Sequence, residues 1–225
     1  MGGRHPPPPL AHPVRMTREP ETKAQRLSIF PLPGAVLFPG LQLPLHMFEP
    51  RYRALVGDAL VRDRRIAMIQ PQRPAEGAPL YGVGCIGRIG DVEALEDGRY
   101  NLVLEGEARF RLLRELDVNT PFRQVEGAVL EEPENDILSS VERAGFEQEA
   151  RRFADAQGYA VDWDSVERLD DQTLVNGVSQ IAPFDPAAKQ ALLEAPDLGT
   201  RCELLVQLMQ FFGRRDGGDD RVTLQ

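Results

Sequence analysis

An apolar segment broken by prolines, residues 29–52, constrains the fold of this chain more than any other feature. It reads IFPLPGAVLFPGLQLPLHMFEPRY. The chain has no charged residue from Leu27 through Phe48, although four prolines interrupt this stretch. Proline lacks an amide donor and fixes φ, and it pushes the preceding residue towards extended geometry, so no regular helix can run through the segment. We therefore predict short extended pieces separated by turns at Pro33-Gly34 and Pro39-Gly40.

The same segment has the length and apolarity of a membrane span, but its prolines, its glycines and His46 argue against that interpretation. The chain has 225 residues, of which 42% are hydrophobic and 27% are charged. This composition is ordinary for a soluble globular protein that can bury a core. We therefore expect the segment to be buried in a β-rich domain, with no membrane contact.

Cysteine usage and the chain ends bear on the cellular compartment. The only cysteines, Cys85 and Cys202, share no local motif, which argues against a disulfide framework and fits a reducing cytoplasm. Residues 1–26 are proline-rich and lack the apolar stretch of a secretory signal, so we expect a disordered arm, with Met16 as an alternative start. The polar residues 214–225 are expected to form a disordered tail.

Charge is distributed unevenly along the chain, whose net charge is −9. Residues 1–26 carry +3, residues 27–133 carry −3 and residues 134–225 carry −9. An acidic body repels phosphate backbones, and the basic arm is too short to reverse that effect. We therefore expect no nucleic-acid partner.

Short apolar or alternating runs, separated by glycine and acidic turns, predict a β subdomain over residues 27–133. Glu96-Asp97-Gly98 is the clearest hairpin turn, and Pro50 opens a helix that continues to about Arg62. Many short strands at regular spacing indicate a small barrel or a pair of packed sheets. The expected strands are Arg65–Ile69, Gly82–Ile89, Val92–Leu95, Tyr100–Leu104, Ala108–Leu113 and Val125–Leu130.

Over residues 134–213 the apolar period becomes that of helices, which predicts a helical bundle. Asp136 is expected to cap the first helix, and Asp164 or Asp170 to begin the second. Asp185-Pro186 combines a strong cap with a proline suited to the first helical position. The bundle should therefore contain several short helices with their own start signals.

The last helix has the most regular apolar pattern of the chain. Its apolar residues alternate spacings of four and three, which predicts one buried seam. Gly213 and the polar residues behind it are expected to end the helix. The seam consists of Leu198, Cys202, Leu205, Met209 and Phe212.

Six sequence motifs, spread over most of the chain, carry a family resemblance. The first three are FPLPG at Phe30–Gly34, LFPG at Leu37–Gly40 and PLHMFEPRY at Pro44–Tyr52. The others are YGVGCIGRI at Tyr81–Ile89, LEGEARFRL at Leu104–Leu112 and ALLEAPDLGTRCELLVQLM at Ala191–Met209. In this order they resemble the N-terminal substrate-binding domain of Lon, the ATP-dependent protease. The resemblance covers about residues 27–212 and implies an α+β fold: a PUA-like β-pseudobarrel followed by an α-helical bundle.

The chain departs from full-length Lon in its catalytic motifs. ATP hydrolysis of the P-loop kind needs a glycine-rich loop followed by Lys and Ser or Thr, and neither Lys23 nor Lys189, the only lysines, has that context. No serine lies in a serine–lysine peptidase motif of the kind that Lon uses. We therefore expect a stand-alone recognition domain that is not an enzyme and uses no cofactor.

Three other patterns have structural interpretations that we favour over functional ones. Gly82, Gly84 and Gly87 spell G-x-G-x-x-G, but a strand follows where a dinucleotide fold needs a helix, so they indicate bulges or close packing in a curved strand. His46 has no suitably spaced nucleophile or further metal ligands, and we expect neither a catalytic nor a metal site. Both cysteines should behave as small buried hydrophobes.

Polar groups appear abruptly after the apolar segment, at Glu49, Arg51 and Tyr52. Arginine and aromatic side chains dominate binding hot spots, so Arg51 and Tyr52 are suited to contact a bound peptide. Alternatively, Glu49 favours the start of a helix and Arg51 pairs with a carboxylate in the barrel wall, which is the role that we favour. The acidic residues at 131–134 and 170–171 are expected to mark a solvated linker and a helix start.

The leading functional hypothesis, which follows from the resemblance, is a module that binds unfolded or apolar polypeptide segments as a protease adaptor or chaperone-like holder. We expect a monomer or weak oligomer that binds in a groove where the barrel meets the helices, with strand addition at exposed edges. The alternative, from analogy of fold alone, is a sensor of a small-molecule or nucleic-acid ligand on the PUA-like barrel. The candidate peptide contacts are Leu37, Phe38, Phe48, Arg51 and Tyr52.

Overall fold

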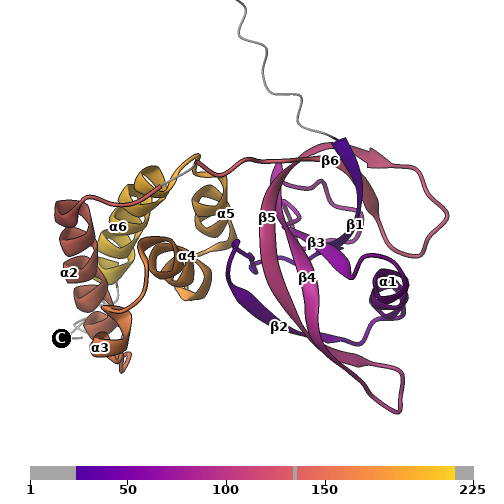
Figure 1. The fold of residues 1–225 in the computed structure, drawn as a ribbon, viewed down its shortest axis with the longest axis horizontal. Coiled ribbons are helices and arrows are strands. Elements are labelled where there is room, and N and C mark those ends of the chain that lie inside the picture. Colours follow the sequence, from indigo (N-terminus) through magenta and orange to yellow (C-terminus); the bar gives the residue numbers. More distant parts are fainter. Residues whose placement is uncertain (1–23, 134–135, 216–225) are drawn as a thin grey trace, which may run out of the picture.

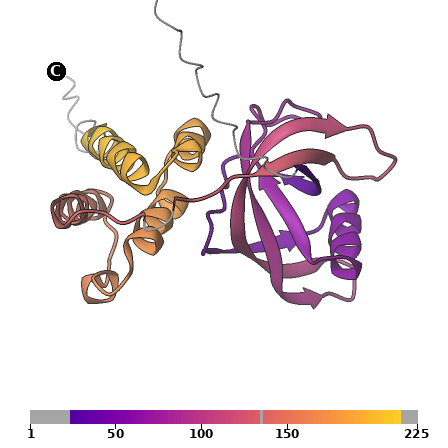
Figure 2. The same cartoon turned by 45° about the horizontal axis from the view of Figure 1, so that its top comes forward.

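The protein has two lobes, a β-barrel and a helical bundle, which the segment after the last strand connects (Figures 1 and 2). The structure is a computed structural model that describes residues 24–133 and 136–215. Most of the expected arm and tail lies outside these residues. The barrel begins earlier than expected, at Ala24, and the last helix reaches Arg215. The predicted α+β architecture is confirmed.

In the described part of the chain, six strands and one helix form the barrel lobe. The strand order is β2-β5-β4-β3-β1-β6, and an additional pairing of β6 with β5 closes five strands while β2 stays at an edge. The long strand β5 pairs with β2 along its first half and with β6 along its second half. The elements are β1 (Ala24–Pro31), β2 (Gln42–Met47), α1 (Pro50–Val61), β3 (Arg65–Ile69), β4 (Val83–Ala94), β5 (Tyr100–Leu116) and β6 (Gln124–Val129).

Strands β4 and β5 are each longer than predicted, because the expected gaps within them are irregularities of pairing and not turns. Their mutual register shifts between Ile86 and Gly87 and again between Ile89 and Val92. A bulge bends and twists a strand while the pairing continues on either side. Four expected strands are therefore two continuous ones.

The two Pro-Gly turns of the apolar segment form as predicted. Gly34 has φ of 76° and Gly40 has φ of 79°, in the left-handed region where only glycine avoids a steric cost. Between these turns the chain leaves the barrel and contacts the helical lobe, because Val36 and Phe38 belong to the helical core.

Most helices of the second lobe begin at a side-chain cap. The carboxylates of Asp170 and Asp185 accept hydrogen bonds from backbone N–H groups three residues on, as predicted. Ser139 begins the first of these helices and forms a capping box with Glu142. The elements are α2 (Ser140–Ala156), α3 (Trp163–Val166), α4 (Asp171–Ile181), α5 (Pro186–Glu194) and α6 (Leu198–Arg215).

Two predicted helix boundaries are wrong. Asp136 does not cap α2, because its carboxylate accepts a hydrogen bond of 2.6 Å from the N–H of Leu198 at the start of α6. Gly213 lies inside α6 instead of ending it. The predicted seam of α6 is confirmed, with its first four residues buried and Phe212 packed against the same core.

Separate apolar clusters form the cores of the two lobes. One barrel cluster contains Leu55 and Leu104, and a second contains Ile29 and Phe110. The helical cluster extends from α2 to α6 and takes in the loop between β1 and β2. Within residues 24–133 and 136–215, no helix is both long and apolar enough to cross a membrane.

Candidate functional site

A groove on the barrel is walled by the proline-broken segment. It has a volume of about 490 Å³ and lies between the end of β1, strand β2, the start of α1 and the loop before β4. We call it the barrel groove. Proline has a fixed φ, which makes such walls stiff, and five prolines line this groove: Pro31, Pro33, Pro44, Pro71 and Pro74.

Aromatic side chains provide apolar surface in the barrel groove. Phe48 is 59% exposed, and its ring stacks on His46 with centroids 6.0 Å apart. Tyr52 packs edge-on against the buried ring of Phe30 at 4.6 Å. Aromatic rings in a concave site are well suited to bury apolar groups of a ligand.

Ion pairs hold the charged residues of the barrel groove in place. Arg51 lies 2.8 Å from the carboxylate of Glu49 and 2.6 Å from that of Glu76. Its guanidinium also lies 4.7 Å from the centre of the Tyr52 ring. Burial raises the pKa of the Tyr52 hydroxyl, so this side chain stays neutral at physiological pH.

Three of the five predicted peptide contacts line the barrel groove, and the other two do not reach the surface. Phe48, Arg51 and Tyr52 line it. Leu37 and Phe38 have no exposed area; Leu37 lies in a barrel core and Phe38 in the helical core. Because a fully buried side chain cannot touch a ligand, we correct these two residues to core positions.

Strand β2 is an edge strand, but it is poorly suited to the expected strand addition. The backbone carbonyl of Gln42 accepts a hydrogen bond of 2.9 Å from the side chain of Gln180, which lies outside the sheet. Alternate residues of a strand share the direction of their backbone polar groups, so those of Pro44 also point away from β5. Since Pro44 has no N–H, the edge lacks a donor in its middle.

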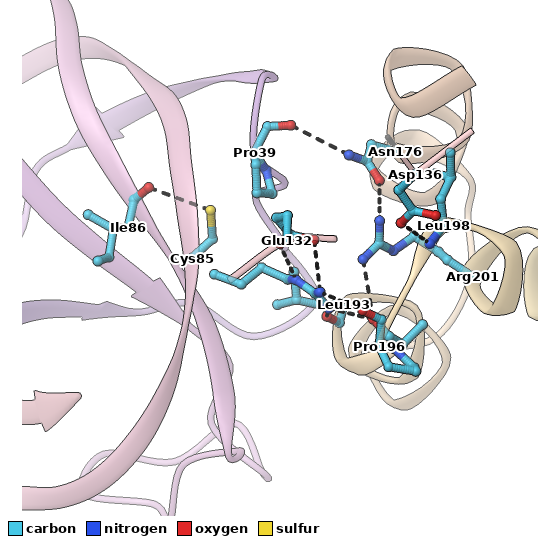
Figure 3. Close-up of polar contacts among 12 residues, drawn as sticks. Pro39, Cys85, Ile86, Glu132, Asp136, Asn176, Leu193, Pro196, Leu198 and Arg201 are labelled. Atoms are coloured by element: carbon cyan, nitrogen blue, oxygen red, sulfur yellow. Dashed lines mark hydrogen bonds and ion pairs between the residues drawn. The ribbon is translucent and has the colours of Figure 1, made fainter. Parts of the chain in front are cut away.

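Polar contacts cross the junction between the lobes, where a groove was expected (Figure 3). Arg109 of β5 is 3% exposed, and it donates two hydrogen bonds of 2.6 and 2.9 Å to the carboxylate of Glu132. It also donates to the backbone carbonyls of Leu193 and Ala195 at the end of α5. Glu132, expected in a solvated linker, is therefore paired with β5, while the carbonyl contacts of Arg109 join the two lobes.

Arg201 of α6 approaches the same junction from the helical side (Figure 3). It donates to the backbone carbonyl of Leu192 and to the side chain of Asn176, and it lies 5.3 Å from the centre of the Phe38 ring. Burial, reinforced by the charge of Arg109, lowers the pKa of Arg201 to about 10. Arg201 therefore stays charged at neutral pH, and its hydrogen bonds help to hold the junction together.

A known protein family matches most of the chain. Residues 26–210 match the family model described as the ATP-dependent protease La (LON) substrate-binding domain. The chain belongs to this family. Lon protease 2 of Myxococcus xanthus is 31% identical over 195 residues, which cover 82% of this chain and 23% of that protein. Lon protease of Anaeromyxobacter dehalogenans (strain 2CP-C) is 39% identical over 101 residues, 43% of this chain and 12% of that protein.

This Lon substrate-binding domain spans at most about a quarter of the length of these curated relatives. Solved structures share its fold. The Lon N-terminal domain protein from Xanthomonas campestris has a TM-score of 0.62 at 24% identity, covering 81% of this chain and 98% of that one. The N-terminal domain of Mycobacterium avium complex Lon protease has a TM-score of 0.62 at 20% identity, with coverages of 83% and 98%. The resemblance that the motifs indicated is confirmed.

The G-x-G-x-x-G pattern of the Lon domain packs a curved strand, as predicted. A Cβ on Gly84 would lie 2.3 Å from the backbone oxygen of Met68, and one on Gly87 would lie 2.9 Å from the side chain of Leu37. Gly82 faces open space. Two of the three glycines therefore permit close approach within the sheet.

The histidine and the two cysteines of the Lon domain lie in different surroundings. His46 bonds Asn101 at 2.7 Å on the surface. Cys85 and Cys202 are buried free thiols, and burial raises both pKa values, to about 11 for Cys202, so neither is a thiolate at neutral pH. Among the residues that the structure describes, no cluster of three or more His, Cys, Asp or Glu side chains could hold a metal ion.

Sequence reasoning missed a second cavity of the Lon domain, in the helical lobe. It has a volume of about 680 Å³ and is lined by residues of α2, α3, α4 and the loop before α3. We call it the helical groove. The available signal was a group of apolar residues in a polar stretch, Tyr159 to Val161, next to the sole tryptophan at Trp163.

Proposed function

We propose that this Lon substrate-binding domain is a non-catalytic module that binds unfolded or apolar polypeptide segments in the barrel groove. As an adaptor it would pass them to a protease, and as a chaperone-like holder it would keep them from aggregating. The observation that carries this proposal is the exposed ring of Phe48 in a stiff, proline-walled groove.

Covering Phe48 and Tyr52 provides most of the binding free energy in this proposal. Aromatic rings offer a large apolar area with few rotatable bonds, and stiff walls need little ordering when a ligand binds. Arg51 is already held by Glu49 and Glu76, so further N–H groups of its guanidinium can donate to a peptide carbonyl without reorganisation. Apolar side chains and free carbonyls occur in every unfolded chain, which suits a receptor of broad specificity.

The same contacts disfavour a small anionic ligand or a nucleic acid. The carboxylates of Glu49 and Glu76 neutralise Arg51. Arg123, which also lines the groove, forms two hydrogen bonds of 2.7 Å with Glu115, and these raise the pKa of Arg123. A phosphate would meet two arginines whose charges fixed carboxylates already balance and would be repelled by those carboxylates, so we prefer a polypeptide ligand.

The other parts of the proposal are supported by the sequence and the cores. Neither Lys23 nor Lys189 lies in a P-loop, which supports a module without catalysis. Two buried free thiols support a reducing, cytoplasmic location. The apolar seam of α6 is buried within its own lobe, which supports a monomer or weak oligomer.

Titration of the full chain into fluorescent, permanently unfolded peptides of graded apolar content tests the proposal through their anisotropy. Replacing Phe48 by Ala should weaken binding by roughly tenfold, because loss of one aromatic hot spot costs about 1–2 kcal/mol. Val61→Ala is the matched control, since Val61 is 83% exposed but lies outside the barrel groove.

Absence of saturable binding to any unfolded peptide at micromolar concentrations would contradict the proposal. Equal weakening by Phe48→Ala and Val61→Ala would remove the barrel groove as the site. Tighter binding of nucleotides or RNA than of any peptide would favour the ligand-sensor alternative.

A further inference from the structure

The helical groove has apolar walls and an exposed rim. The rings of Phe146 and Phe153 are buried in it, whereas Tyr159 is 50% exposed and Ile181 is 78% exposed. Trp163, the only tryptophan of the chain, lines the same cavity. Apolar surface of this kind in a concave site marks a contact surface for another apolar group.

The segments that form the helical groove are acidic. Residues 140–182 carry nine acidic and four basic side chains, which gives a net charge of −5. Three of the four arginines are already paired with carboxylates of the same region, so an occupant with basic residues complements it best. These pairs are Arg143 with Glu147 and Asp171, Arg151 with Glu167, and Arg152 with Glu149.

Residues 4–18 of this same chain have the matching chemistry. They read RHPPPPLAHPVRMTR and contain five prolines, three arginines and no acidic residue. Proline-rich segments bind aromatic-lined grooves well, because their extended polyproline II backbone is set before binding and loses little entropy. An apolar centre around Leu10, with Arg4 and Arg15 on either side, fits an aromatic groove in an acidic lobe.

The segment is tethered to the barrel lobe by a short stretch of chain. Leu10 lies fourteen residues before Ala24, where β1 begins. A polyproline II chain rises about 3.1 Å per residue, which gives a reach of about 40 Å. A compact lobe of about 100 residues is about 35 Å across, so the tether is long enough to pass beyond the barrel lobe towards the helical lobe.

We propose that residues 4–18 occupy the helical groove of their own molecule. The prolines and Leu10 cover Trp163, Tyr159 and Ile181, and the arginines face the acidic residues around the groove. High salt should weaken this contact, because it screens the attraction between the arginines and the acidic residues. This proposal is independent of the barrel groove, whose residues belong to the other lobe.

A paramagnetic relaxation experiment on the full chain tests the contact. Both native cysteines are buried and their pKa values are raised, so a nitroxide can be attached selectively to a cysteine introduced as Ala11→Cys. The indole N–H of Trp163 gives a single resonance, which a nearby nitroxide broadens. We expect loss of most of this signal, and its return when the nitroxide is reduced.

Two further variants in the labelled chain define the surface. Ile181→Asp and the triple change Arg4→Glu/Arg15→Glu/Arg18→Glu should each restore the Trp163 signal. Val141→Asp is the matched control for Ile181→Asp, since Val141 is 82% exposed but lies outside the helical groove, and it should leave the signal broadened.

Full indole intensity in the oxidised, labelled chain would overturn the proposal. Broadening that arises only between molecules, in a mixture of nitroxide-labelled chain and isotope-labelled chain without nitroxide, would also overturn it and assign the groove to a second copy. Restoration by Val141→Asp to the same extent as by Ile181→Asp would refute the helical groove as the binding surface.

Discussion

The contacts that stabilise each lobe differ in sequence range. They join distant residues in the barrel and nearby residues at the starts of the helices. In the barrel, Ala24 pairs with Ala128, so a strand is stable only when distant parts of the chain are in place. In the helical lobe, α2 begins through Ser139 and Glu142 and α4 through Asp170 and Thr173, pairs that are three residues apart. The barrel therefore depends on the complete fold, whereas the helices depend on local signals and one shared core.

Breaking the contact between the lobes should give the largest effect. Arg109 is itself buried, and replacing it by Met removes the partner of the partly exposed Glu132 together with hydrogen bonds to three backbone carbonyls. Losing these contacts costs about 3 kcal/mol. We expect the lobes to unfold separately in urea. Trp163 fluorescence reports the helical lobe, and hydrogen exchange of strand amides reports the barrel.

The matched control for Arg109→Met is Arg114→Met on the same strand. Arg114 is exposed and pairs with Glu126, and such surface pairs contribute less than about 1 kcal/mol. Equal losses of stability for the two variants would show that burial of the Arg109 pair has no special role.

A methyl group placed on β5, against the backbone of the loop between β1 and β2, should give the next largest effect. In Gly106→Ala the new Cβ would lie 2.0 Å from the backbone oxygen of Phe38. This carbonyl cannot retreat freely, because the backbone of Gly106 is hydrogen bonded to Gly40 and Leu41. Overpacking of this kind costs about 3 kcal/mol. Thermal unfolding measures it, and Gly82→Ala, in open space, should cost much less if the contact is the cause.

Removing a helix cap should have a smaller effect, confined to the helical lobe. The carboxylate of Asp170 accepts hydrogen bonds of 2.8 Å from both the N–H and the hydroxyl of Thr173. Asp170→Ala should cost about 1 kcal/mol, the usual value for a lost cap. Urea unfolding followed by Trp163 fluorescence is the measurement. The nearby Asp164→Ala removes an exposed carboxylate that caps no helix and should change little.

The same cap predicts a dependence on pH. Hydrogen bonds from Thr173 lower the pKa of Asp170, so this carboxyl contributes stability that is fully present above its unfolded pKa of about 4 and lost as the pH falls below it. Asp170→Ala should therefore lose stability less steeply than the parent chain below about pH 4. Parallel slopes for the two proteins would show that Asp170 does not contribute.

The smallest effect should have the opposite sign. Gly145 lies within α2, and a Cβ there would meet nothing within 4 Å. Gly145→Ala should raise stability by about 0.5–1 kcal/mol, because alanine loses less backbone freedom on forming a helix. Chemical unfolding gives the value. A loss of stability at Gly145 would contradict the view that the helical lobe follows local propensity.

Local signals made much of the fold predictable. The turn at Pro33-Gly34 and the start of α5 at Asp185-Pro186 could be read from adjacent residues, since each depends on its own backbone preferences. Asp136 could not be placed, because its partner Leu198 lies 62 residues away. The continuity of β4 was missed for a similar reason, since a bulge and a turn look alike until the neighbouring strand is known.

The candidate site was predictable where polarity changes along the chain. Phe48, Arg51 and Tyr52 stand where the apolar segment meets charged residues, and all three line the barrel groove. Leu37 and Phe38 have the same apolar character but face two cores, and sequence alone does not say which side of an irregular segment is buried. The helical groove is lined by residues of α2, α3 and α4 together, and no single segment encodes that arrangement.

The position of β1 in the sheet has a consequence for synthesis of the barrel on the ribosome. Strand β1 lies between β3 and β6, and translation supplies these two neighbours at very different times. Once residues 65–69 have emerged, β1 can pair on one side, but its other edge stays open until residues 124–129 follow. Besides the edge of β2, the nascent chain therefore carries two strand edges that are paired only later, on β1 and on the end of β5, and such edges invite mispairing. Emergence of β6 covers both in a single step.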